Sequence, residues 1–74
     1  MRYLVVVEET EGGFSAYSPD LGGCVATGST REEVQREMAA AIAFHLEGLQ
    51  SEGIEIPEPH SFSTYVDVPA QPGR

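Results

Sequence analysis

The chain has 74 residues, enough for one domain with a small hydrophobic core. Twelve Asp and Glu against four Lys and Arg give a formal net charge of −8, so phosphate backbones repel the chain and we expect no direct binding to nucleic acid. The single cysteine excludes an internal disulfide, and the sequence lacks both a signal-peptide pattern before Glu8 and an apolar run of roughly 18 residues, which predicts a soluble, cytoplasmic protein without membrane contact.

The first predicted element is a strand over residues 3–8, rich in β-branched side chains. Apolar side chains occupy both of its alternating faces: Tyr3, Val5 and Val7 on one, Leu4 and Val6 on the other. A strand with two apolar faces is typical of the middle of a sheet. Residues 9–13 end in two glycines and predict a hairpin loop, after which the alternation of residues 14–18 predicts an antiparallel second strand.

A second turn is predicted over residues 19–23, followed by a short third strand over residues 24–27. Gly28 is expected to end this strand. Asp20 follows Pro19 and suits the turn, because its carboxylate can accept a hydrogen bond from a nearby backbone N–H.

The next element is a predicted helix with a marked beginning. Thr30 with Glu33, or Ser29 with Glu32, has the spacing of a capping box, which leaves the first residue open by one position. The helical period places one apolar stripe toward the sheet: Val34, Met38, Ala41, Ile42, His45 and Leu49. Gly53 is predicted to end the helix as its C′ residue.

Alternation in residues 61–68 predicts a fourth strand, and residues 69–74 are expected to form a flexible tail. A helix between the third and fourth strands favours a right-handed crossover, which places the fourth strand parallel to the first and beside it. The predicted fold is therefore α+β, with element order β-β-β-α-β, a four-stranded mixed sheet in the order 3-2-1-4, and one helix on one face. Residues 1–68 form the predicted domain.

Several motifs follow one another at characteristic spacings along the chain. They are residues 3–8, Pro19-Asp20-Leu21, Gly23-Cys24, Thr27-Gly28-Ser29-Thr30 with Glu33, Ala41-Ile42 and Ile56-Pro57-Glu58-Pro59. In this order they resemble the HicB antitoxin family, from about residue 2 to residue 68. The resemblance implies a partial ribonuclease-H-like fold. It also implies a partner, a small basic RNA-cleaving toxin of the HicA type, which the antitoxin neutralises by covering its active surface.

The chain departs from the family pattern in two places. Gly22 stands where the family often has a second proline, which predicts a looser turn. Larger antitoxins of this kind carry a DNA-binding domain after the fourth strand, whereas six residues follow Val68 here. We therefore expect the toxin-binding module without operator binding.

Candidate catalytic residues are few. Cys24 has no basic neighbour in sequence to lower its pKa, and His45 lies within the apolar stripe of the helix, so both are interpreted as packed residues. Cys24, His45 and His60 lack the spacing of metal ligands. A ribonuclease-like site needs clustered carboxylates to hold two metal ions, and the middle of the first predicted strand has valines instead. We expect no enzyme activity, no metal and no cofactor.

The predicted function is neutralisation of a HicA-like toxin in a type II toxin–antitoxin system. The candidate partner-binding residues are Glu9, Glu11, Tyr17, Asp20 and Leu21. A core this small, together with a sheet that one helix can cover on one face only, also predicts a homodimer or homotetramer. The alternative that remains open is a homo-oligomeric accessory protein of similar fold without a toxin partner.

Overall fold

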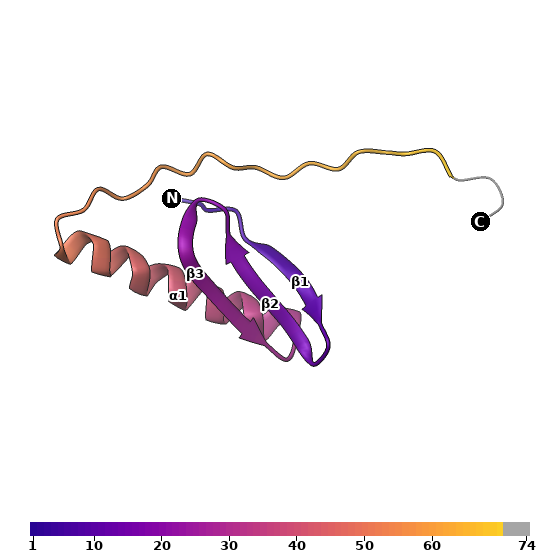
Figure 1. Ribbon diagram of the computed structural model, residues 1–74, viewed down its shortest axis with the longest axis horizontal. Helices are drawn as coiled ribbons and strands as arrows, with labels where there is room; N and C mark the ends of the chain where they lie inside the picture. Colours follow the sequence, from indigo (N-terminus) through magenta and orange to yellow (C-terminus); the bar gives the residue numbers. More distant parts are fainter. Residues whose placement is uncertain (71–74) are drawn as a thin grey trace.

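A computed structural model describes residues 1–70 and contains one antiparallel sheet with a helix packed along one of its faces (Figure 1). The elements are β1 (Val6–Thr10), β2 (Gly13–Ser18), β3 (Leu21–Gly28) and α1 (Arg31–Ser51). The strands lie in the order β1-β2-β3. The predicted α+β class, the first three strands and the helix are therefore confirmed, together with the 3-2-1 part of the predicted order.

The β1–β2 hairpin begins later along the chain than expected. Val6 pairs with Tyr17 and Thr10 pairs with Gly13, and β2 ends one residue beyond Tyr17, so residues 3–5 extend past the end of β2 without a strand opposite them. The loop itself is short, since only residues 11 and 12 separate the two strands.

Strand β3 contains a bulge of three residues where a turn was predicted. The regular register ends where Tyr17 pairs with Val25, yet the next residue of β2, Ser18, pairs with Leu21. Residues 22–24 are thus extra residues on β3, and Gly23 adopts a left-handed φ of 80°, which glycine tolerates without steric cost. The predicted turn over residues 19–23 is wrong in extent, because only residues 19 and 20 turn the chain.

The ends of α1 follow capping rules closely. Thr30 is the N-cap: its hydroxyl accepts a hydrogen bond from the Glu33 N–H at 3.0 Å, while the Glu33 carboxylate accepts one from the Ser29 N–H. At the other end Gly53 has a φ of 72°, and the N–H groups of Gly53 and Ile54 donate to the carbonyls of Gln50 and Leu49. This is the Schellman pattern, so Gly53 is the C′ residue as predicted.

The core lies between α1 and the sheet. Its buried members are Ala16, Leu21, Cys24, Val34 and Met38. The predicted helical stripe is confirmed in its first four members, since Val34 and Met38 are buried and Ala41 and Ile42 pack against this cluster; Leu46, which was not predicted, packs there as well. Gly28 ends β3 where the strand meets the helix, and a Cβ placed there would lie 2.7 Å from the backbone nitrogen of Val34, so a side chain at this position would push the two elements apart.

The predicted fourth strand is not formed. After Ser61 the chain runs as an extended segment away from the sheet, which we call the arm (residues 62–70; Figure 1). All nine arm residues are exposed and none belongs to a strand. A strand needs a neighbouring backbone to bond to, and within residues 1–70 nothing pairs with the arm. The fourth place in the order 3-2-1-4 is therefore empty, and β1 is an edge strand rather than a central one. Residues 71–74 of the predicted tail lie outside the described residues.

Candidate protein-binding surface

The face of the sheet opposite α1 carries a row of apolar side chains that crosses all three strands. Val6, Tyr17 and Val25 are consecutive partners in the strand register, so their side chains lie side by side. Their chain neighbours Val7, Ala16 and Ala26 pack toward the helix, and alternation then directs the row to the other side. We call this row, with its flanking residues, the open face.

The open face is apolar in its middle and polar at its border. Tyr17 is 42% exposed and Val25 66% exposed, although both are large hydrophobic residues. The next register row consists of Glu8, Ser15 and Thr27. An apolar centre with a polar rim is the composition of a protein-binding surface.

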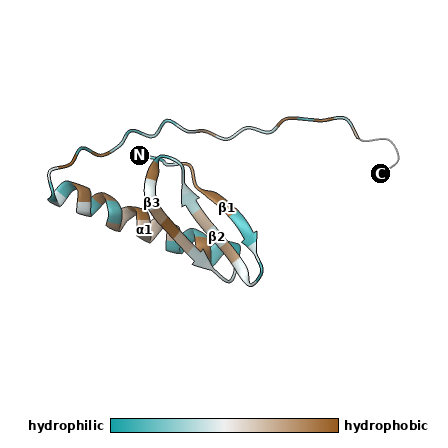
Figure 2. Cartoon of the chain, viewed as in Figure 1, coloured by the Kyte–Doolittle hydropathy of each residue, from teal (hydrophilic) through white to brown (hydrophobic). Residues whose placement is uncertain are grey.

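Strand β1 also changes from apolar to polar along its length. Figure 2 shows this strand passing from hydrophobic near its start to hydrophilic near its end, where the hairpin loop follows. Glu9 and Glu11 lie at this hydrophilic end, and both are exposed. Glu9 lines a shallow hollow on the helix side with Arg31, so its side chain does not belong to the open face.

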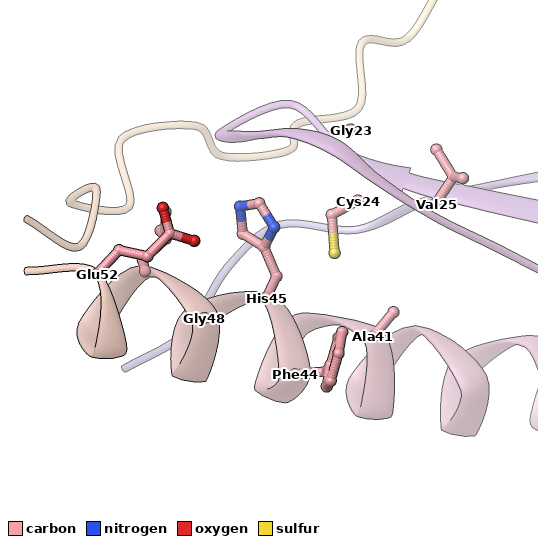
Figure 3. A pocket seen from close by; sticks show the side chains of 9 residues that line it. Gly23, Cys24, Val25, Ala41, Phe44, His45, Gly48 and Glu52 are labelled. Atoms are coloured by element: carbon pink, nitrogen blue, oxygen red, sulfur yellow. The ribbon is translucent and has the colours of Figure 1, made fainter. Parts of the chain in front are cut away.

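A groove of about 410 Å³ separates the start of β3 from the second half of α1 (Figure 3). Cys24 points from the sheet toward the helix and His45 points from the helix toward the sheet, whereas Val25 points the other way. Burial raises the pKa of the Cys24 thiol, which favours the unreactive protonated form. Cys24 is therefore a packed core residue at this groove and not an activated nucleophile.

Among residues 1–70, the Asp20 side chain makes the most hydrogen bonds. Its side chain is fully buried, and its two oxygens accept hydrogen bonds from the N–H groups of His60 and Ser61, both at 3.0 Å, and from the Ser61 hydroxyl at 2.7 Å. The His60 Nδ1 lies 3.2 Å from the same carboxylate. The Ser61 hydroxyl lowers the pKa of Asp20 most, burial opposes it, and the two N–H groups and His60 add to the lowering.

A second contact holds the same C-terminal segment. The Tyr3 hydroxyl donates to the Pro57 carbonyl at 2.6 Å. Burial raises the pKa of Tyr3, and the nearby charges of Glu58 and Asp20 raise it further, so the hydroxyl keeps the proton that it donates. Tyr3 and Asp20 together fix residues 57–61 and set the point from which the arm departs.

The structure separates the five residues predicted to bind a partner. Tyr17 lies in the centre of the open face, while Glu9 and Glu11 lie at the hairpin end. Asp20 holds the C-terminal segment and Leu21 is a core residue with 2% exposure, so the side chains of both are occupied within the chain. Of these five residues, only Tyr17, Glu9 and Glu11 offer their side chains to another molecule.

Val6 and Val25 are not among the residues predicted to bind a partner. The predictions place Val6 on one of the two apolar faces of a central strand and Val25 in a short third strand. The signal that identifies them is the register, because two consecutive pairings connect Val6 to Tyr17 and Tyr17 to Val25. That connection depends on the length of the β3 bulge.

Among residues 1–70 no group of three or more His, Cys, Asp and Glu side chains is arranged to hold a metal ion. In the same part of the chain, no helix combines the length and the apolar character needed to cross a bilayer.

Residues 3–73 match a family described as "HicB_like antitoxin of bacterial toxin-antitoxin system". Over 69 residues the chain is 30% identical to the "Uncharacterized 14.9 kDa protein in rep-hol intergenic region" of Haemophilus phage HP1. The match covers 93% of this chain and 52% of the phage protein, so the chain spans about half the length of that relative.

Two solved structures contain a similar fold. A chain of the "HicA3 and HicB3 toxin-antitoxin complex" superposes with a TM-score of 0.69 and 33% identity, over 80% of this chain and 70% of that one. The crystal structure of the antitoxin HicB3 gives a TM-score of 0.67 and 35% identity, over 77% of this chain and 42% of that one.

Proposed function

Because the chain belongs to the HicB_like antitoxin family of bacterial toxin–antitoxin systems, we propose that it binds a HicA-like toxin and neutralises it. The observation that carries this proposal is the similarity to a chain of the HicA3 and HicB3 complex, over four fifths of the present chain. The toxin would be small, basic and RNA-cleaving, as the family resemblance implies, and the proposed role is binding rather than catalysis.

The proposed contact surface is the open face. Helix α1 covers the other side of the sheet, so Val6, Tyr17 and Val25 form an apolar row on the face that the helix leaves uncovered. Burial of such a row against a partner would be favourable by about 25 cal/mol per Å² of apolar surface. Tyr17 adds a hydroxyl that can form a hydrogen bond at the edge of the contact.

The acidic charge of the chain supports the same partner. A net charge of −8 is complementary to a basic protein and unfavourable for a nucleic acid. Glu8 borders the apolar row directly, and Glu9 and Glu11 extend the negative charge along the hairpin end. Neutralisation would then follow from occupation of the basic surface with which the toxin approaches RNA.

Serine substitutions of Tyr17 and Val25 test the surface. Each removes exposed apolar area from the open face without touching the core, so the variant Tyr17→Ser/Val25→Ser should fold normally. We expect its affinity for the HicA-like protein encoded beside this gene to fall at least about tenfold, equivalent to about 1.4 kcal/mol, by isothermal titration calorimetry.

Phe44→Ser provides the matched control. Phe44 is 80% exposed on α1, so its replacement removes a comparable apolar side chain from the helix rather than from the open face. The control should bind like the unchanged protein. Equal loss of affinity in both variants would contradict the open face as the contact surface, and absence of binding by the unchanged protein would contradict the proposed function.

A further inference from the structure

The sheet has two open edges, the outer sides of β1 and β3, and we call the outer side of β1 the open edge. Strand β1 pairs with β2 alone, and the backbone of residues 3–5 continues the same edge. Residues 61–63 line a hollow together with residues 2–5 but form no strand beside them. The side chains of residues 3–7 along this edge are apolar, which is unusual for an exposed edge, since edge strands commonly carry charges or proline that prevent pairing with other chains. The edge is therefore competent to accept another strand.

A hollow of about 270 Å³ lies beneath this edge, on the helix side. Tyr3 and Val5 form one wall and α1 forms the other, with Gln35, Met38, Ala39 and Ile42. A fourth strand beside β1 would direct every second side chain into this hollow. The two-layer core is thus incomplete at the position where the fourth strand belongs.

The arm has the composition of that missing strand. Apolar side chains alternate along it: Phe62, Val66 and Val68 share one face with Thr64. The three apolar members are between 77% and 84% exposed in the isolated chain. Exposed apolar groups in this pattern mark an element whose partner lies in another molecule.

Acidic residues are rare in the two segments that would pair, residues 3–7 and the arm. The chain carries 12 acidic residues, yet residues 3–7 contain none and residues 61–70 contain only Asp67. Two copies of a chain with a net charge of −8 repel each other at most surfaces, and an uncharged strand beside an uncharged edge avoids this repulsion.

We propose that two copies of the chain exchange their arms, so that residues 62–68 of each copy form a fourth strand on the open edge of the other. The contacts of Asp20 and Tyr3 hold residues 57–61 against their own sheet, and from there the arm departs from the body (Figure 1). Each copy then lacks a fourth strand and offers one, which is the self-complementary arrangement of a closed dimer.

Sedimentation equilibrium of the full chain at micromolar concentration tests the exchange. We expect a dimer, with twice the chain mass of 8.0 kDa. The variant Phe62→Ser/Val66→Ser/Val68→Ser should sediment as a monomer at the same concentration, because its arm offers no apolar face. Tyr65→Ser is the matched control, since Tyr65 is 99% exposed on the opposite face of the arm, and it should remain a dimer.

Amide hydrogen exchange distinguishes the arm from other dimer contacts. Amides of residues 62–68 should be protected in the dimer and should exchange freely in the monomeric triple variant, whose far-UV circular dichroism should keep the helical signal of α1 and so show that the body is still folded. A monomeric full chain, with its arm protected or free, would overturn the proposal. So would a dimer that survives the triple substitution, a dimer with unprotected arm amides, or a dimer that Tyr17→Ser/Val25→Ser dissociates and the triple substitution does not.

Discussion

Asp20 shows how one buried carboxylate can decide the course of a whole segment. It lies in a two-residue turn between β2 and β3, yet its hydrogen-bond partners are 40 and 41 residues later in the chain. A buried carboxylate is costly without partners, and here two N–H groups and a hydroxyl satisfy its oxygens. The residue therefore ties the C-terminal segment to the sheet.

Asp20→Ala should lower the stability of the fold in a pH-dependent way. The folded chain holds the pKa of Asp20 below its ordinary value of 3.8, so the carboxylate stabilises the fold fully above that pH and loses its contribution as the pH falls through the lowered pKa. Urea midpoints of the unchanged protein and the variant should differ at pH 7 and converge in strong acid. A difference that is constant with pH would contradict the assigned role. The comparison cancels the titration of the other acidic residues.

At the scale of elements, the helix was the most predictable part of the chain. Its period, its two end signals and its stripe depend on residues within a few positions of one another. The structure confirms the helix, its two ends and the first four residues of the stripe. Of the two predicted capping boxes, the structure contains the one with Thr30 and Glu33. Thr30 caps the helix, and the Glu33 carboxylate accepts a hydrogen bond from the Ser29 N–H.

Thr30→Ala tests this assignment. It removes the acceptor for the Glu33 N–H and should reduce the free energy of unfolding by about 0.5–2 kcal/mol in urea denaturation. Ser29→Ala is the control: the structure uses the backbone N–H of Ser29, which alanine retains, so its midpoint should stay near that of the unchanged protein. A larger loss for Ser29→Ala would place the cap one residue earlier.

The strands were less predictable, for two physical reasons. The β3 bulge inserts residues 22–24 and reverses the alternation, so that Leu21 and Cys24 both enter the core although they are three residues apart. A period-2 pattern cannot reveal such an insertion, and Leu21 was assigned to a turn. Residues 61–68 have the pattern of a strand, but the pattern does not specify which backbone pairs with them.

The candidate surface was predictable only in part for the same reason. Tyr17 could be selected from its residue type and its place in an alternating strand, and it lies in the open face. Val25 required the register, and Asp20 required knowledge of where residues 60 and 61 fold back. Contacts over 40 residues leave no local trace in the sequence.

At the scale of the whole molecule, net charge and shape contribute differently to the proposed complex. Opposite charge accelerates encounter over distances of about one Debye length, roughly 8 Å at physiological ionic strength, while apolar burial on the open face holds the complex afterwards. The exposed carboxylates at the hairpin end, Glu9 and Glu11, belong to the first contribution.

Glu9→Gln/Glu11→Gln should therefore slow association with the HicA-like protein more than it accelerates dissociation. Surface plasmon resonance at two salt concentrations measures both rates, and the association rate of the unchanged protein should fall as salt rises. Glu47→Gln on the outer side of α1 is the control with the same chemical change at an exposed site. A change confined to the dissociation rate would place these carboxylates inside the contact.

Inhibition of RNA cleavage tests the central claim most directly. The HicA-like protein encoded beside this gene would be titrated with the present chain, and cleavage of a defined RNA would be followed at each ratio. The account predicts that cleavage ceases once the two proteins reach their binding stoichiometry. Cleavage that continues in excess of this chain, although the toxin is active alone, would contradict it.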